Sequence, residues 1–369
     1  MDDSAQSIIS SLHEGSPVRT PPDDSAAQTP PPAATPLTVV SPSAAPPPAQ
    51  APQAQVAEER AQSADESAPK HTARPTDPMI VFAYECLRRE FKELVDRRPV
   101  EPTAPPVDDV HRMRIAMRRL RVALRLFRRM LPRAAKDFRR DLRGFARALG
   151  DVRDVDVHAE TFRSFAQTIP ADSLAELGGY ELHLRRERAE ARAQMNECFG
   201  DHRYDDLLAG FAALLENAPS PGAQRRWRSF KVSEGVNKYL KKSLKRVLKL
   251  GRKVGAEAHD KDLHRLRIRA KRLRYELEFF AFAYKSLGKA AAEAKVLQDL
   301  LGEHQDACTA AGRLADYARS LRKHGGGQMP AALVRLAESE TQRARAARQS
   351  FPAEWRRFER SVARRRTAL

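Results

Sequence analysis

The sequence predicts an all-α protein made of two similar helical bundles of the four-helix type, preceded by a disordered N-terminal tail. Three observations lead to this prediction. From Pro78 onward, apolar residues recur with helical spacing and without strand-like alternation. A long segment is repeated 153 residues later, from position 111 to position 264. Residues 1–75, finally, have the composition of a chain that does not fold.

The predicted tail, residues 1–75, is rich in proline, alanine and serine. Thirteen of the 25 prolines lie before residue 70, and large apolar residues are few. Such a segment buries too little surface to offset the entropy lost on ordering. It carries nine acidic and four basic residues, so the rest of the chain holds a formal charge of +23. We interpret the tail as a tether; weak competition for a basic site is the alternative.

The folded part, residues 76–369, is predicted to consist of about eight to ten helices. Leucine, alanine, arginine, lysine and glutamate dominate it, and these are good helix formers. Proline and glycine mark the breaks, which fall at 99–106, near 132, at 169–172, near 200, at 217–222, near 255, near 288 and at 325–330. The repeat divides this part into halves of about 76–220 and 221–369.

The helix predicted for residues 110–131 has one apolar and one cationic face. At 100° per residue, Met113, Met117 and Leu120 share the apolar sector with Leu124 and Phe127. The opposite sector holds His111, Arg114, Arg118, Arg121 and Arg125. No acidic residue occurs in this segment. Because like charges at i,i+4 repel one another, this stripe predicts an anionic ligand.

The second half repeats the stripe and a motif that follows it. His264, Arg267, Lys271 and Arg274 correspond to the first four cations, and Glu278 takes the place of Arg125. Leu-Gly-x-x-x-Asp at 149–154 likewise matches the segment at 301–306, in which the aspartate is Asp306. We expect each glycine to mark a turn and the acid after it to cap a helix. A metal site made by these acids is the less favoured reading.

The helix predicted for residues 230–253 adds further cations to the second half. It carries nine lysines or arginines against one acid. Lys238, Lys242 and Lys245 group opposite its apolar residues, so we extend the predicted site to them.

Two copies of a His-x-x-Arg-x-x-x-(Arg/Lys)-Arg-Leu-Arg helix, each followed by the glycine motif, resemble the CHAD family, the conserved histidine α-helical domain. The resemblance covers roughly residues 77–365. It implies two four-helix bundles related by a pseudo-twofold axis, and binding of inorganic polyphosphate at polyphosphate granules. The implied ligand residues are His111, Arg114, Arg118, Arg121, His264, Arg267, Lys271 and Arg274. Many members follow a triphosphate-tunnel catalytic domain; without such a barrel, this chain resembles a stand-alone binding domain.

The bulk composition favours a polyanionic partner. The chain of 369 residues has a formal net charge of +18 and a sequence pI near 10.2. Its three cysteines, Cys86, Cys198 and Cys308, form no CxxC pair, which argues against disulfides and a zinc site. With no 18-residue apolar run and no secretory signal, we expect a cytoplasmic protein that contacts no membrane. No cofactor, metal or protein partner is predicted.

The predicted function is non-catalytic binding of polyphosphate. The two histidines are expected to bind phosphate, with helix capping or packing as the alternative. Binding of nucleic acid through its phosphates is the main alternative function; only Tyr275 lies near the basic sector to stack on a base. A polyphosphate hydrolase or kinase is less favoured, because the stripes lack carboxylates for Mg²⁺.

Overall fold

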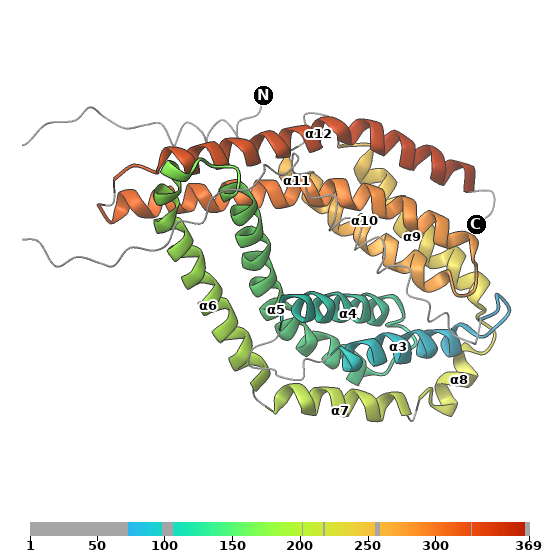
Figure 1. The fold of residues 1–369 in the computed structure, drawn as a ribbon. Coiled ribbons are helices and arrows are strands. Elements are labelled where there is room, and N and C mark those ends of the chain that lie inside the picture. Colours follow the sequence, from blue (N-terminus) through green and yellow to red (C-terminus); the bar gives the residue numbers. More distant parts are fainter. Residues whose placement is uncertain are drawn as a thin grey trace, which may run out of the picture. The chain divides into compact units, whose positions relative to one another are not determined.

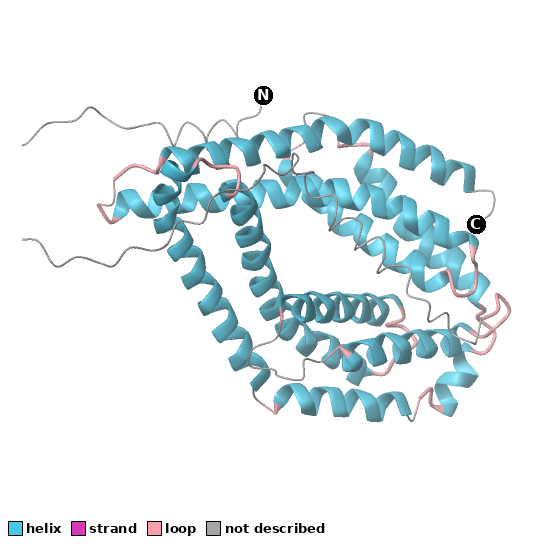
Figure 2. Ribbon diagram, in the orientation of Figure 1, coloured by secondary structure: helices cyan, strands magenta, loops and turns pink. Residues whose placement is uncertain are grey.

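The computed structural model describes residues 73–97, 106–200, 202–216, 218–254, 259–325 and 327–365. Within them, all regular structure is helical apart from one isolated β-bridge (Figures 1 and 2). The helices are α3 (Met79–Asp96), α4 (Val107–Leu126), α5 (Arg133–Ala166), η1 (Ala171–Leu177), α6 (Gly178–Gly200), α7 (Arg203–Glu216), α8 (Pro221–Trp227), α9 (Val232–Gly251), α10 (Asp260–Phe280), α11 (Ser286–Lys323) and α12 (Ala331–Arg365).

Two sets of four helices follow the same packing order. Helices α3, α4, α5 and α6 pack each on the next, and so do α9, α10, α11 and α12. Helices α7 and α8 connect the two sets, and α4 packs against α10 where the sets meet. The predicted all-α fold with two similar bundles is therefore confirmed. The predicted tail lies outside the described residues up to residue 72.

The repeat is realised as a local twofold relation at the start of each bundle. Pro78 and Lys231, which are 153 residues apart, form the antiparallel bridge. Met79 N donates to Phe230 O at 2.8 Å, and Val232 N donates to Asp77 O at 3.0 Å. Each residue thus contacts the equivalent of its own neighbour, which is the pattern that a twofold axis produces. The bridge fixes which residues of the two halves correspond.

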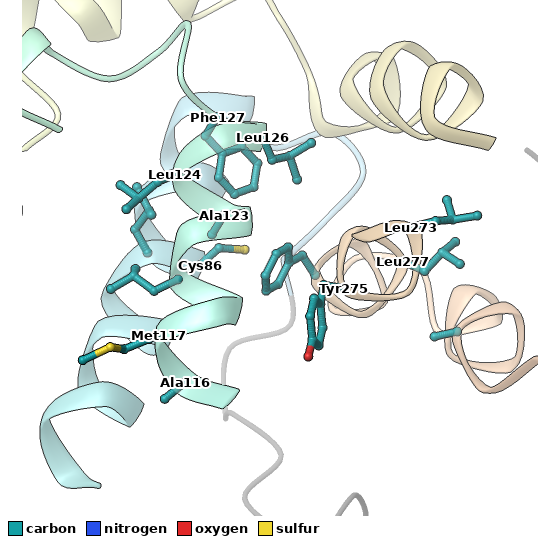
Figure 3. Close-up of a cluster of buried hydrophobic side chains, with 14 of the residues drawn as sticks. Cys86, Ala116, Met117, Ala123, Leu124, Leu126, Phe127, Leu273, Tyr275 and Leu277 are labelled. Carbon is teal, nitrogen blue, oxygen red and sulfur yellow. The ribbon is translucent and has the colours of Figure 1, made fainter. Parts of the chain in front are cut away.

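The main core is built by the apolar faces that meet between α3, α4 and α10. Phe127 and Phe280, equivalent in the repeat, both pack on Phe82, with ring centroids 6.1 and 5.5 Å away. Figure 3 shows the facing side chains of α4 and α10, with Tyr275 on the side of α10 that faces α4. Burying these large side chains stabilises the crossing by roughly 1.5–3 kcal/mol each.

A second apolar cluster joins the far ends of the long helices. Phe162 of α5 and Tyr180 of α6 lie there with Leu314 of α11 and Leu333 of α12. The cluster ties the two bundles together a second time, far along the chain from the α4–α10 crossing. No helix in the described ranges is both long and apolar enough to cross a membrane.

Gly251 is expected to be sensitive to substitution, because it lies against an aromatic ring. A Cβ on Gly251 would come within 2.1 Å of the Trp355 ring, which is only 6% exposed. Phe351 stacks on that ring at 6.1 Å and limits its movement. We expect Gly251→Ala to lower the free energy of unfolding by about 1–3 kcal/mol, the usual cost of overpacking, as measured by urea denaturation.

Gly144 provides the matched control for this prediction. It also lies within a helix, α5, but its Cβ would meet nothing within 4 Å. Gly144→Ala should therefore raise the free energy of unfolding by up to about 1 kcal/mol through helix propensity. If both variants were equally stabilised, the Trp355 ring would have to move aside at little cost, contrary to the packing seen here.

Candidate functional site

Helices α4 and α10 place the two predicted stripes beside one another. Each helix buries its apolar face; Met117 and Leu120 of α4 and Leu273 of α10 are at most 2% exposed. Asp108 and Asp109 lie in the first turn of α4, and α10 has two aspartates in its first turn, where negative charge favours a helix. Because the buried faces meet, the cationic side chains are left at the edge of the crossing.

Four of these cations come together from the two halves, and we call them the central cluster: Arg114, Arg118, Arg267 and Lys271. Burial, together with repulsion from Arg118, Arg267 and Arg114, lowers the pKa of Lys271 to about 6. Burial also lowers the pKa of Arg114 to about 10, with Arg118 and Arg267 among its repelling neighbours. The structure thus brings the two stripes into one site.

The repeated glycine motif supports the outer arginine of each half. Gly150 of α5 lies under Arg114, whose Nε is 4.0 Å from an ideal Cβ at that position; Gly302 of α11 lies 3.9 Å from Arg267 Nε in the same way. One turn further, Asp154 Oδ1 is 3.4 Å from Arg114 Nη2. Asp306 Oδ1 is 3.8 Å from Arg267 Nη2. A Cβ at either glycine would make ordinary van der Waals contact with the arginine, and the aspartate pairs with the far end of the guanidinium group.

The expectation that these motifs form turns and caps is wrong. Gly150 lies inside α5, and Gly302 lies inside α11, each more than a dozen residues from the start of its helix. Each glycine was expected to mark a turn because glycine weakens helices, but both are accommodated inside long, well-packed helices. The aspartates of the motif pair instead with arginines, Asp154 with Arg114 and Asp306 with Arg267.

The central cluster holds more cations than carboxylates. Asp154 and Asp306 face Arg114 and Arg267, but no carboxylate among the described residues pairs with Arg118 or Lys271. Burial raises the pKa of Asp306, which the nearby Arg267 and Lys271 oppose. Like charges held in a partly buried site repel one another strongly, so a bound anion would stabilise this arrangement.

Arg274 and Glu278 lie at the end of the α10 stripe. Arg274 Nε is 3.4 Å from Glu278 Oε1, and Glu278 also pairs with Arg119 of α4. Arg119 is further held by Glu90 of α3 at 2.7 Å. Burial lowers the pKa of Arg119, but Glu90 and Glu278 more than offset this and raise it. The α10 stripe therefore ends in a neutralised network.

The α4 stripe continues with cations that the sequence analysis did not include. Burial lowers the pKa of Arg121, and Arg143 and Arg139 of α5 contribute by repulsion. Both lie on the face of α5 that also carries Gly150 and Asp154, given a helical period. That shared face was the signal that could have revealed them. Arg125 is exposed at the end of the stripe, where its neighbours are again arginines.

The two histidines lie at the start of their stripes, in different surroundings. His264 is exposed, and its Nδ1 is 2.6 Å from Gln305 Oε1 of α11, so Nδ1 carries the proton in this contact. His111 is half-buried. The hydrogen bond of His264 orients the ring and leaves Nε2 as a hydrogen-bond acceptor in the neutral form.

The three predicted lysines of α9 lie on its exposed side. Lys238 Nζ is 5.3 Å from the centre of the Phe230 ring, and Lys242 and Lys245 are exposed. In the described part of the chain, none of these three lysines pairs with a residue of the central cluster. Arg246 is the α9 residue whose charge acts on α4, through Arg125.

One group of side chains could hold a metal ion by ligand type. Asp260, His304 and Cys308 bring three ligand atoms within 4.8 Å of one another. Asp260 Oδ1, however, already lies 3.2 Å from His304 Nε2 and pairs with Arg348. The guanidinium opposes a cation at that oxygen. Asp156 of α5, which lies two residues after Asp154, is buried and pairs with Arg188 at 2.6 Å.

Comparisons with known proteins agree on one family. The CHAD domain family model matches residues 85–315. Two uncharacterized proteins of Mycobacterium tuberculosis, from two strains, are each 26% identical over 270 residues, which is 70% of this chain and 50% of the relative. This chain thus spans about half the length of the curated relatives it matches.

Two solved structures share the fold. The CHAD domain from the plant Ricinus communis aligns with a TM-score of 0.61 at 21% identity, covering 78% of this chain and 95% of that one. PptA from Streptomyces chartreusis aligns with a TM-score of 0.60 at 18% identity, covering 76% and 99%. The helical fold is therefore shared with proteins of distant sequence.

Proposed function

Because the chain belongs to the CHAD domain family, we propose that it binds inorganic polyphosphate and does not act on it chemically. One observation carries the proposal: the central cluster joins two cations from each half in one partly buried site with too few carboxylates to balance them. A ligand that supplies closely spaced negative charges and little else matches that arrangement.

Polyphosphate is such a ligand, because its phosphates repeat along a linear chain. Arginine binds phosphate through two parallel hydrogen bonds, whereas lysine acts as a point charge. Along a helix face, cations one turn apart are about 5.4 Å from each other, so they can contact successive parts of an extended chain. Affinity should then arise from many modest contacts and should fall steeply with salt.

Nucleic acid is the less well-supported ligand. Proteins that bind single strands place aromatic rings beside the cations so that bases can stack. The one aromatic residue predicted near the basic sector, Tyr275, is 2% exposed and lies beneath Arg274, whose guanidinium carbon is 4.8 Å from its ring centre. It has no free face for a base. A site that recognises phosphates alone agrees better with this surface.

The absence of catalysis is part of the proposal, and the carboxylates support it. Enzymes that transfer or hydrolyse phosphoryl groups hold Mg²⁺ through carboxylates that face the phosphates. In the central cluster, Asp154 and Asp306 face Arg114 and Arg267 instead. We further propose that binding brings the protein to polyphosphate granules in the cytoplasm.

The test of this function compares polyanions of equal charge. Long-chain polyphosphate is expected to bind at least about tenfold more tightly than single-stranded DNA at physiological salt, because the site recognises dense charge and offers no stacking surface. Binding to polyphosphate, DNA and RNA should be measured by fluorescence anisotropy at two salt concentrations. Equal affinities for all three would contradict the proposal and indicate a generic polyanion-binding surface.

A further inference from the structure

The two halves differ in charge at the places where α4 and α10 cross, which the local twofold relation makes equivalent. In the first half, Arg119 is held between Glu90 of α3 and Glu278 of α10. The bridge between Pro78 and Lys231 fixes the offset of 153 residues, so each of these residues has a known counterpart. We call this first arrangement the glutamate crossing.

At the equivalent crossing in the second half, the carboxylates are replaced. Arg272 corresponds to Arg119, but Arg125 stands in the place of Glu278, and Ser243 in the place of Glu90. The next acid of α3, Glu93, corresponds to Arg246 of α9. Three acidic positions have thus become two arginines and a serine.

The structure confirms that the arginines gather there, and we call them the arginine cluster: Arg125, Arg128, Arg139, Arg246 and Arg272. Arg128 Nη1 donates to Arg125 O at 3.4 Å. Repulsion by Arg272 is the largest cause of the lowered pKa of Arg125, and the other three arginines contribute. Arg272 pairs with the buried Glu276 at 2.7 Å. One carboxylate against five guanidinium groups leaves a large excess of positive charge.

The arginine cluster is continuous with the central cluster along α4. Arg118 belongs to the central cluster, Arg121 follows about one turn later, and Arg125 follows another turn later. Arg121 interacts with Arg118 on one side and Arg139 on the other. From Arg118 to Arg125 the helix rises about 10 Å. On α10, by contrast, the equivalent path from Lys271 ends at Glu278.

We propose that the arginine cluster is a second binding segment for the same condensed phosphate chain, so that the chain leaves the central cluster along α4 and not along α10. The inference rests on the proposed function. Its physical basis is that the two ends of a nearly twofold site differ in charge: the excess guanidinium groups attract the continuing chain at one end, whereas at the other end the arginines of the glutamate crossing are already neutralised by Glu90 and Glu278.

This arrangement makes binding depend on ligand length. A short condensed phosphate occupies the central cluster alone, whereas a longer chain also reaches the arginine cluster. Once the central cluster holds one part of a long chain, the contacts to the arginine cluster form within the same complex. They therefore increase the affinity without any change in the contacts at the central cluster.

The test combines Arg125→Gln and Arg246→Gln in the full chain. Both side chains are exposed, and their removal relieves repulsion, so the melting temperature should not fall. We expect the affinity for long-chain polyphosphate to fall about tenfold, and the slope of log K against log salt to become smaller in magnitude by about 1.5, since two phosphate contacts are lost. The affinity for tripolyphosphate should stay unchanged.

The matched control replaces Lys289 and Arg335, which are exposed on α11 and α12, by glutamine. This control removes two positive charges from helices other than α4. It should leave the affinities for long-chain polyphosphate and for tripolyphosphate unchanged. Unchanged binding of long chains to the Arg125→Gln/Arg246→Gln variant, or equal losses for tripolyphosphate and long chains, would overturn the inference. The proposed function would still stand if charge reversal in the central cluster removed binding. If the unaltered protein bound neither ligand, both proposals would fail.

Discussion

Replacing Arg118 and Lys271 together by glutamate is expected to abolish polyphosphate binding. Each residue comes from a different half, and neither pairs with a carboxylate in the described part of the chain, so both side chains are available to the ligand. Removing a partly buried charge from an interface costs about 2–5 kcal/mol, and reversal adds repulsion. The Kd should therefore rise on the order of 10³-fold or more, as measured by anisotropy with labelled long-chain polyphosphate.

The double reversal should leave the fold intact, which makes the result interpretable. The new carboxylates would lie among Arg114, Arg267 and Arg274 and would relieve the repulsion that now exists there. We expect unchanged helical content by circular dichroism and a melting temperature that is equal or higher. Reversal of Lys289 and Arg335 makes the same change in net charge at exposed positions and should lower affinity only slightly. Retained binding in the first variant would place the site elsewhere.

Polyphosphate affinity is expected to fall as the pH rises from 6 to 8, because binding must protonate Lys271. In the free protein, burial and the neighbouring arginines hold the pKa of Lys271 at about 6, so the amine is largely neutral above that pH. A bound polyanion raises this pKa. The complex then holds more protons than the free protein between the two pKa values, and affinity decreases by up to about tenfold per pH unit within that window.

The measurement is a titration at pH 6, 7 and 8 at constant salt, with calorimetry in two buffers of different ionisation enthalpy to detect proton uptake. The control is Lys271→Arg, because arginine keeps its charge and removes this contribution. If Lys271→Arg showed the same pH dependence as the unaltered protein, protonation of Lys271 would not be its cause.

Lys271 also affects stability in the absence of ligand. An unfolded chain protonates this lysine up to about pH 10.4, whereas the folded chain releases the proton near pH 6. The unfolded state therefore binds more protons in between, and this residue makes folding more favourable as the pH rises through that window. A bound anion would offset the repulsion among the arginines around Lys271 and would therefore stabilise the folded protein.

The candidate site could be predicted in part from the sequence. The repeat identified His111, Arg114, Arg118 and their counterparts because helical periodicity places them on one face. The same reasoning identified the residues of the glycine motif but misassigned their role: in sequence, a glycine inside a helix cannot be distinguished from one that ends it. Only the packing of α4 on α5 shows that Gly150 lies inside a helix beside Arg114.

The lysines of α9 show the opposite difficulty. Their position opposite the apolar residues of the helix predicts that they are exposed, and they are. The exposure of a helix face does not determine which other helix lies near it. Arg246, from the same face, lies near Arg125, while Lys238 lies over Phe230. Arg139 and Arg143 of α5 were not predicted, although helical periodicity places them on the same face as Gly150 and Asp154.

By itself, the sequence determined the helical fold, the division into two equivalent halves and the presence of two cationic stripes. These properties depend on residue type and on periods of a few residues, which are local. The tertiary structure decided which charges meet: that Lys271 is buried among arginines, that Glu278 neutralises Arg119, and that Arg125 and Arg246 gather with Arg272. Such effects arise between residues more than a hundred positions apart, because electrostatic energy depends on distance and burial in space, and the order of residues along the chain specifies neither.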